Sequence, residues 1–406
     1  MMSLNKYKLA DIAKIEISGV DKKTIEGEIP VRLCNFVDVY YNWAITKEKA
    51  KSFMVASAKQ TEIDKCSIGK GMVAITKDSE TRDDIGVATY IADDFDNVVL
   101  GYHCALIIPN SAVVDGKYLN AFMHTRYIQK YFENNASGSG QRYTLSNDTI
   151  GNIPVLLPSI DEQHTIGKVL ADIDRKIELN KRINDNLEAM AKQLYDYWFV
   201  QFDFPNEEGK PYKSSGGAMV WNDKLKREIP QGWDFCVLED LLTIRNGRDH
   251  KHLADGIYPV YGSGGEMRKV SEYLYDGESV LMPRKGSLNN IMYVNEAFWT
   301  VDTMFYSEMK LSNCAKYIYY TIKDIDFTRW DSGTGVPSMT SSTLYSIKLV
   351  KPQNETLKKF DEMISPLFEH MKQISEQNVV LTKQRDELLP LLMNGQASVN
   401  YHLSDD

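Results

Sequence analysis

The sequence lacks the features that are typical of membrane, secreted and disulfide-bonded proteins. None of its apolar runs approaches the roughly 20 residues that span a bilayer, since the longest candidate, residues 98–108, contains His103. Residues 1–10 are polar and have no apolar segment like that of a secretory signal. The five cysteines lie far apart and form no C-x-x-C pair, which predicts reduced, mostly buried thiols and no zinc site. We therefore expect a cytoplasmic protein.

Known catalytic motifs are also missing. Residues 68–71 (Ile-Gly-Lys-Gly) lack the first glycine and the hydroxyl of a phosphate-binding loop. The chain has no Pro-Pro dipeptide, so it has no Asn-Pro-Pro-Tyr or Asp-Pro-Pro-Tyr edge like that of amino-methyltransferases, and no common nuclease motif is found. His250 and His252, near Asp249, form a weak metal motif and fit a polar loop better. We expect neither catalytic residues nor a metal site.

The chain has a surplus of acidic residues. Its formal net charge is −9, which taken alone argues against binding to phosphates. Because a DNA-binding surface is local, however, the clustering of basic residues matters more. Basic residues gather in three stretches, 245–251, 268–269 and 284–285. Scattered, solvated charges are the alternative interpretation.

The most informative feature is that the chain repeats itself once. A Gly-rich loop at 137–140 has a counterpart at 332–335, and each is followed by a short apolar strand, a proline and a long helix. Residues 7–12 resemble 236–241, and Ser18-Gly19 answers Asn246-Gly247. The intervening parts differ. A duplicated frame with a diverged insert suits two modules that do one kind of job on different targets.

The two modules are predicted to be strand-rich. Residues 72–76, 98–108, 280–282 and 291–294 are short, apolar and β-branched or aromatic. Residues 118–132 and 316–322 are expected to be helical. The pattern predicts mixed α+β domains.

Two long helices carry heptad repeats. The first is expected to begin near Asp161 or Glu162, just after a proline. In each helix, apolar residues form two rows at a period of 3.5, which indicates a coiled coil. In the first helix, one row consists of residues 166, 173, 187 and 194, and the other of residues 170 and 177. In the second helix, one row consists of residues 357, 364, 371 and 392, and the other of residues 360, 367, 374, 381 and 388. Polar residues interrupt them at Asn180, Asn184, Asn378 and Arg385, and Pro366 is a candidate for a kink.

Two such helices in one chain are expected to pair with each other in antiparallel fashion. About 36 residues at 1.5 Å each would form a rod of roughly 54 Å, against roughly 34 Å for one turn of B-DNA. Such a rod could place two modules on one duplex. A coiled coil that merely joins two domains is the alternative.

Several segments carry a family resemblance. Residues 158–163 (PSIDEQ) and 194–199 (LYDYWF) are similar to the start and end of the first spacer helix in specificity subunits of type I restriction–modification systems. Residues 228–233 (EIPQGW), 258–265 (YPVYGSGG) and 385–395 (RDELLPLLMNG) resemble later features of that family, although residues 354–357 lack the Glu-Gln of the first repeat. The chain thus resembles this family along nearly its whole length.

The resemblance implies an α+β fold in which two mixed α/β target-recognition domains are separated by two long antiparallel coiled-coil helices, with a pseudo-twofold internal repeat. The expected parts are a first recognition domain at 1–160, spacer helices at 161–204 and 354–395, a linker at 205–232, a second recognition domain at 233–353 and a tail at 396–406.

The resemblance also implies a function without catalysis. Each domain would read one half of a split site in double-stranded DNA. The helices would set the gap and dock two modification subunits, which carry S-adenosylmethionine. A restriction subunit that uses ATP and magnesium is a further candidate partner, and no cofactor is expected in this chain.

The candidate site residues lie in or beside the Gly-rich loops, where the backbone can approach DNA closely, or they carry polar or basic groups that can bind it. The DNA-binding candidates are Ser139, Gln141, Arg142, Tyr143, Arg245, Arg248, Lys251, Tyr261, Ser263, Arg284, Lys285, Ser287, Thr334 and Ser338. The candidates for partner docking are Tyr197, Trp198, Phe199, Leu388 and Leu389.

Three alternatives stay open. The chain could serve a methyltransferase that only modifies DNA. It could instead be a stand-alone methyltransferase or nuclease, against which the missing motifs argue. It could also be a two-domain scaffold that binds protein or glycan.

Overall fold

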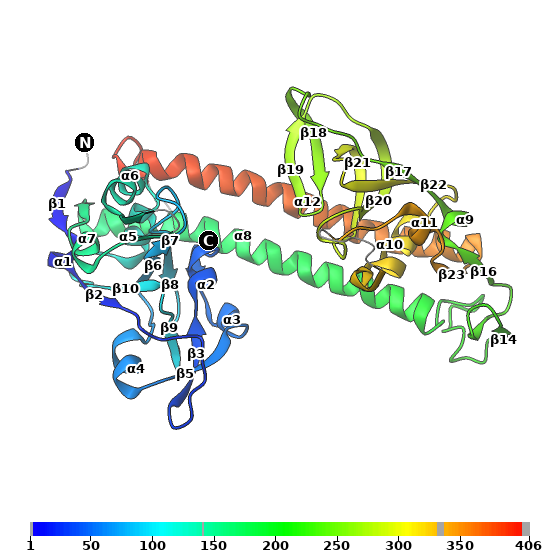
Figure 1. Cartoon of the computed structure of the whole chain (residues 1–406), viewed down its shortest axis with the longest axis horizontal. Helices are drawn as coiled ribbons and strands as arrows, with labels where there is room; N and C mark the ends of the chain where they lie inside the picture. Colours follow the sequence, from blue (N-terminus) through cyan, green and yellow to red (C-terminus); the bar gives the residue numbers. More distant parts are fainter. Residues whose placement is uncertain (1–2, 140–141, 331–336, 400–406) are drawn as a thin grey trace, which may run out of the picture. The chain divides into compact units, whose positions relative to one another are not determined.

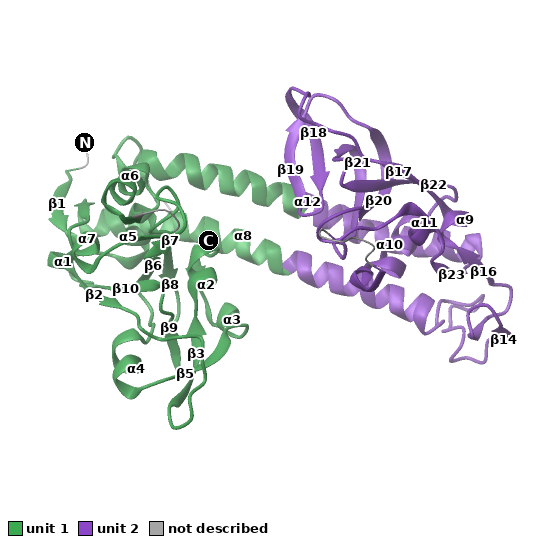
Figure 2. Cartoon of the chain, in the orientation of Figure 1, with its two compact units in different colours: residues 1–182, 374–406 green, residues 183–373 purple. Residues whose placement is uncertain are grey.

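A computed structural model describes residues 3–139, 142–330 and 337–399. The chain divides into two compact units, one of residues 1–182 with 374–406 and one of residues 183–373 (Figure 2). Each unit contains one module and a part of both long helices (Figure 2).

The module of the first unit is built on a five-stranded sheet. Its strand order is β2 (Ala13–Ile17), β10 (Cys104–Pro109), β6 (Val73–Thr76), β8 (Ala88–Ile91) and β4 (Ala44–Ile45). Smaller sheets are formed by β1 (Asn5–Lys8) with β13 (Pro154–Leu157), by β5 (Met54–Ala58), β3 (Ile29–Cys34) and β9 (Val98–Leu100), and by β11 (Ser137–Ser139), β12 (Arg142–Thr144) and β7 (Asp78–Ser79). The helices are α1 (Leu9–Ile12), α2 (Phe36–Tyr40), α3 (Lys47–Ala50), α4 (Gln60–Cys66), α5 (Gly116–Met123), α6 (Arg126–Asn135) and α7 (Asn147–Gly151) (Figure 1).

The module of the second unit has a six-stranded sheet. Its order is β17 (Leu242–Asn246), β22 (Met304–Met309), β20 (Tyr275–Pro283), β21 (Met292–Thr300), β18 (Asp255–Gly262) and β19 (Gly265–Val270). Two-stranded sheets are formed by β16 (Asp234–Val237) with β23 (Lys348–Lys351) and by β14 (Met219–Asn222) with β15 (Arg227–Pro230). The helices are α9 (Leu238–Leu241), α10 (Ala315–Lys323) and α11 (Ser341–Tyr345), with a 3₁₀ turn at Phe327–Trp330 (Figure 1).

The internal repeat is confirmed by hydrogen bonds that recur at equivalent positions. The amide of Leu9 donates to the carbonyl of Ile153, and the amide of Leu238 donates to that of Ile347, both near 3 Å. The hydroxyl of Tyr118 donates to the carbonyl of Leu156 at 2.7 Å, as that of Tyr317 does to the carbonyl of Val350 at 2.5 Å. The α+β fold with two repeated modules is therefore as predicted.

One detail of the predicted repeat is shifted. The amide of Ser18 donates to the carbonyl of Cys104, and the amide of Gly247 donates to that of Met304. Ser18 is therefore equivalent to Gly247 rather than to Asn246, because the backbone pairing of the two sheets, and not the glycine pattern, sets the register.

Two predicted elements are divided. The helix expected at 118–132 is two helices, α5 and α6, because the side chain of Thr125 caps the second by accepting from the amide of Ile128. The apolar stretch 98–108 is two strands, β9 and β10. The helix predicted at 316–322 is confirmed as α10.

The two long helices form as expected from their heptads. They are α8 (Ile160–Tyr195), which continues into a π turn at Asp196–Val200, and α12 (Asn354–Met393), which is helical through Pro366. At the start of α8, Glu162 accepts hydrogen bonds from the amide and hydroxyl of Ser159.

Within each unit the two helices run antiparallel. In the first unit, Asn180 donates to Asn378 at 2.8 Å, and Asp174 lies 3.8 Å from Arg385. In the second, Asn184 donates to the carbonyl of Met371 at 3.2 Å. The polar residues that interrupt the heptads are thus paired across the seam, where they fix its register.

The ends of the helices lie in the hydrophobic cores. In the first unit, Ile166 and Leu170 of α8 share a core with Leu389 and Leu392 of α12. In the second unit, the end of α8 and the start of α12 share a core, whose members include Tyr195, Trp198, Phe199, Leu357, Phe360 and Ile364. Each helix therefore belongs to the core of both modules.

The cysteines are in the state that the sequence predicts. All five cysteines are free and buried. No helix among the described residues is long and apolar enough to cross a bilayer. Within the same residues, no three His, Cys, Asp or Glu side chains are grouped as metal ligands, and His252 lies 3.9 Å from Asp249.

Replacement of Asn180 tests the polar register of the seam. Its amide is 1% exposed and donates to Gln377 at 2.7 Å and to Asn378 at 2.8 Å. We expect Asn180→Ala to destabilise the chain by about 1–3 kcal/mol, because it leaves partly buried amide groups unpaired. Urea unfolding of the full chain measures the change. The control Lys176→Ala, on the exposed face of the same helix, should stay within about 0.5 kcal/mol, and equal values for the two variants would contradict the role.

Candidate nucleic-acid interface

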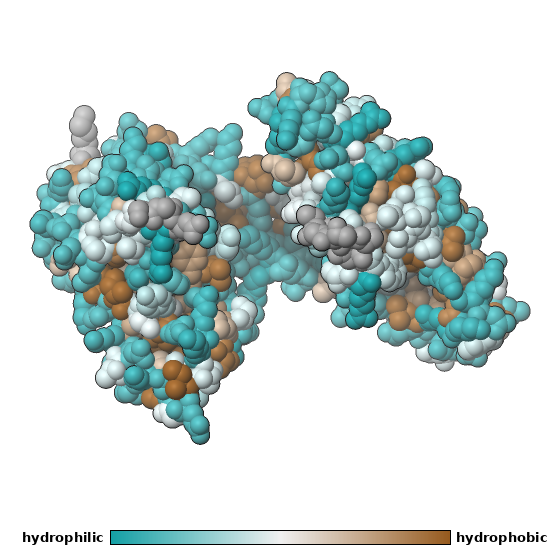
Figure 3. Space-filling view, in the orientation of Figure 1, coloured by the Kyte–Doolittle hydropathy of each residue, from teal (hydrophilic) through white to brown (hydrophobic). Residues whose placement is uncertain are grey.

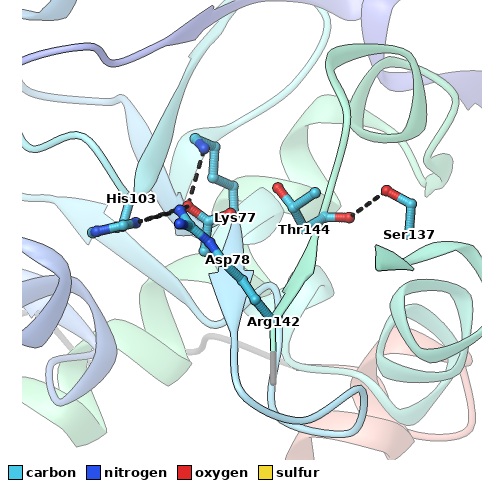
Figure 4. Close-up of polar contacts among 6 residues, drawn as sticks. All are labelled: Lys77, Asp78, His103, Ser137, Arg142 and Thr144. Carbon is cyan, nitrogen blue, oxygen red and sulfur yellow. Dashed lines mark hydrogen bonds and ion pairs between the residues drawn. The ribbon is translucent and has the colours of Figure 1, made fainter. Parts of the chain in front are cut away.

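Residues 137–139 of the first Gly-rich segment, which the sequence predicts as a loop, form strand β11 at the edge of a three-stranded sheet, because they pair with β12. β11 pairs with β12, and β12 pairs with β7, so that Tyr143 faces Ser79 and Thr144 faces Asp78. This pairing places Arg142 beside Asp78, with Nη2 3.2 Å from Oδ2, and leaves 59% of the Arg142 side chain exposed (Figure 4). Arg142 is therefore anchored on one side and open to solvent on the other.

Asp78 is the centre of a cluster of basic groups. Its Oδ2 also lies 3.1 Å from Nζ of Lys77 and 2.8 Å from Nδ1 of His103 (Figure 4). Burial acts to raise the pKa of Asp78, but hydrogen bonds from His103, Thr144 and Lys77 outweigh it and lower the pKa to about 2. The carboxylate is therefore ionised at neutral pH, and by accepting hydrogen bonds it holds the groups around it in place.

The other candidates of this loop are only partly placed. Tyr143 is half-buried, and the guanidinium of Arg82 lies 5.0 Å from the centre of its ring. Ser139 ends β11, and its side chain is not among those described. Gln141 lies outside the described residues.

An equivalent edge exists in the second module. The amide of Met339 donates to the carbonyl of Arg284 at 2.9 Å, and Ser338 bridges to Lys285. Arg284, Lys285 and Ser287 are exposed. The guanidinium of Arg284 lies 5.9 Å from the ring centre of Phe305. Thr334 lies outside the described residues.

The turn at residues 300–303 brings three predicted segments together. The amide of Arg248 donates to the carbonyl of Thr300, the amide of Val301 to that of Tyr261, and the amide of Arg284 to that of Thr303. Two of the basic stretches predicted from the sequence thus converge with the Tyr261 strand at one edge of the sheet.

Tyr261 and Ser263 take partly structural roles. The hydroxyl of Tyr261 donates to Glu296 at 2.8 Å, and burial together with this hydrogen bond raises the pKa of the tyrosine, so it remains a donor. The carbonyl of Ser263 accepts from Asn290 at 2.8 Å. A side chain at Gly286 would come within 2.9 Å of the Ser263 hydroxyl, so these loops are in close contact.

Arg245 and Lys251 differ from the others. Arg245 is on β17, and its Nε and Nη2 each lie 3.1 Å from an oxygen of Glu308, a bidentate ion pair. Lys251 is exposed, and its amide donates to Asp249.

The predicted docking residues are mostly buried. Trp198 is 2% exposed, Phe199 5% and Leu389 7%, and each packs in the core of its unit. These three side chains therefore hold the helix ends in place and cannot present a docking surface as they stand. Tyr197 is 37% exposed and Leu388 is half-buried.

Sequence reasoning missed Lys77, Asp78 and His103. A signal was available in the repeat, because Lys77-Asp78 follows a core strand of the first module just as Arg284-Lys285 follows one of the second. On the face drawn in Figure 3, hydrophilic side chains predominate and hydrophobic ones form small, separate patches.

The sequence is similar to a known protein family and to two of its members. The family model of the type I restriction modification DNA specificity domain matches residues 3–189 and 230–379. The MjaIX specificity subunit of a type I restriction enzyme from Methanocaldococcus jannaschii is 28% identical over 322 residues, covering 72% of this chain and 71% of that protein. The HindI specificity subunit from Haemophilus influenzae is 22% identical over 391 residues, covering 78% of this chain and 85% of that protein.

A solved structure shares the fold. The S subunit of a type I restriction-modification system from M. genitalium superposes with a TM-score of 0.60 at 16% identity, covering 96% of both chains. The repeated modules, the antiparallel helices and a family match over more than half of the chain lead to one conclusion. The chain belongs to the family of type I restriction–modification DNA specificity subunits, the non-catalytic subunits that recognise the DNA sequence.

Proposed function

We propose that each module reads one half of a bipartite site in double-stranded DNA. The observation that carries this proposal is the repeat itself. Both modules hold an equivalent exposed edge with the same backbone hydrogen bonds, yet the side chains on that edge differ. One frame with two sets of side chains suits the reading of two different base sequences.

The contacts are proposed to lie at these edges. In the first unit they involve Arg142 and Tyr143, and in the second Arg248, Arg284 and Lys285. Their exposed guanidinium and ammonium groups can donate to phosphates or to base edges in the major groove. Local clusters of this kind supply the positive surface that a net charge of −9 does not.

The paired helices are proposed to set the gap between the half-sites. Their seam is pinned by paired polar residues and by the burial of both helix ends, which leaves little freedom in their length. They would also carry two modification subunits that hold S-adenosylmethionine, with Tyr197 and Leu388 among the contacts. A restriction subunit that uses ATP and magnesium would complete the assembly in the cytoplasm.

A specificity subunit for modification alone, or a scaffold for protein or glycan, would behave differently. A gel shift with random duplexes, with and without the methyltransferase partner, separates the scaffold from a DNA reader. Cleavage of unmodified DNA by the assembled system separates a subunit that serves both restriction and modification from one that serves modification alone.

Arg142→Ala is expected to weaken DNA binding by the chain assembled with its modification subunits. Loss of the guanidinium removes an exposed donor to a phosphate or a base edge, and affinity is measured over a series of salt concentrations. Arg126→Ala is the matched control, because Arg126 is exposed on the same module and pairs with Glu133. Unchanged affinity of Arg142→Ala across a salt series would count against the contact.

Charge reversal at Lys285 is expected to damage recognition of only one half-site. Binding is measured on duplexes in which either half-site is scrambled, after selection of the preferred duplex from a random pool. Lys210→Glu, at an exposed lysine of the same unit, controls for the change in charge. Equal loss of discrimination at both half-sites would contradict modular reading.

Shortening both helices is expected to shorten the gap. Deletion of the heptad around Asn180 and of the facing heptad around Asn378 removes about 10 Å of helix at 1.5 Å per residue. This length corresponds to about three base pairs at 3.4 Å each. Methylation sequencing of cells that carry the variant should show a shorter gap or no methylation. Full activity with an unchanged gap would contradict the proposal that the helices set the gap between the half-sites.

A further inference from the structure

The two modules carry opposite charges at one equivalent position. The amide of Leu145 donates to the carbonyl of Lys77 at 2.8 Å, as that of Met339 donates to the carbonyl of Arg284 at 2.9 Å. Asp78 then faces Thr144, and Lys285 faces Ser338. Asp78 in the first module is therefore the counterpart of Lys285 in the second.

The surroundings of these two residues differ as well. The Asp78 side chain is 8% exposed and has three basic partners on one oxygen, of which Lys77 is 11% exposed and Arg142 59% exposed. Lys77 also lies over the ring of Tyr102 at 5.1 Å, which keeps it at the base of the cluster. Arg284 and Lys285 are exposed, and within the described part of the chain neither forms an ion pair with a carboxylate. At this equivalent position, a buried carboxylate therefore holds an exposed arginine in the first module, and no described carboxylate does so in the second.

A guanidinium held in this way has two properties that a free one lacks. Its orientation is limited, which favours the two parallel hydrogen bonds that an arginine makes to O6 and N7 of guanine. The internal carboxylate also competes with backbone phosphates for the same positive group, and phosphate contacts supply most of the sequence-independent affinity.

We propose that Asp78 is a specificity-determining positioning residue of the first module, which holds Arg142 for a base edge and withholds it from phosphate. The inference rests on the proposed function, in which Arg142 contacts DNA. Lys285, at the same place in the second module, is exposed and has no carboxylate partner among the described residues, so it binds as a point charge. The two half-sites are therefore discriminated by different chemistry at equivalent positions.

The test is a double-mutant cycle between Asp78→Asn and Arg142→Ala in the chain assembled with its modification subunits. The probes are the duplex selected from a random pool by the wild-type complex, the same duplex with either half-site scrambled, and a duplex without the site. Asp78→Asn should bind the last probe several-fold more tightly and steepen its salt slope by about 0.9, as expected for one added phosphate contact. Its discrimination against one scrambled half-site should fall about tenfold, within the range of one bidentate base contact, while the other half-site is unaffected.

The cycle separates positioning from a structural role. In the Arg142→Ala background, Asp78→Asn should change neither affinity nor discrimination, whereas a general effect on folding would persist there. Glu133→Gln, which removes a carboxylate from beside the exposed Arg126, should match the wild type. If Asp78→Asn does not fold, Arg142→Lys takes its place, because it keeps the charge and loses the fork, and it should lose discrimination at the same half-site with affinity retained.

Two failures can be told apart. If Arg142→Ala has no effect on any probe, the proposed contact with DNA is wrong. If Arg142→Ala weakens binding but Asp78→Asn behaves as Glu133→Gln does, the contact stands and the role of Asp78 is refuted.

Discussion

The burial of both ends of each long helix in the module cores is the constraint on which the rest of the structure depends. In the second unit, Phe360 of α12 packs against Trp198 and Phe199 in the π turn that follows α8, with ring centroids 5.6 and 4.8 Å apart. Loss of one such buried aromatic side chain typically costs about 3–5 kcal/mol. In the first unit, Leu389 and Leu392 share a core with Ile166 and Leu170. A module therefore cannot fold fully without the helices that leave and reach it.

Because the cores and the backbone hydrogen bonds fix each module, the side chains on its surface can vary. The recurring hydrogen bonds, such as those of Leu9 and Leu238, involve backbone atoms, so they persist when side chains change. The edge that carries Arg142 in one module and Lys285 in the other can then differ in charge without loss of the fold. This separation of frame from surface explains how one duplicated architecture can serve two recognition tasks.

Much of the fold could be predicted because its signals are local or periodic. The heptads gave both long helices, and the matching order of loop, strand and proline gave the repeat. Sheet order depends on long-range strand pairing, which a periodic pattern does not contain. The split of 118–132 into two helices depends on one capping residue, Thr125, which hydrophobic periodicity does not detect. Trp198 and Phe199 were predicted as docking residues because aromatic side chains at a helix end can serve either a core or an interface, and only packing decides between them.

The candidate site was less predictable. Basic stretches indicated Arg284 and Lys285, but the turn at residues 300–303 that brings them near Tyr261 is a tertiary feature. Asp78 was not predicted from the sequence, because a single acidic residue after a strand forms no distinctive pattern. Its importance appears only when His103 and Arg142, which are distant in sequence, join the neighbouring Lys77 around it.

Methylation sequencing of cells that carry the intact system tests the central claim most directly. Two modules that read separate half-sites, joined by helices of fixed length, predict one bipartite motif: two short runs of defined base pairs with a constant gap of undefined ones. A single continuous motif, or two runs separated by a variable gap, would contradict the account.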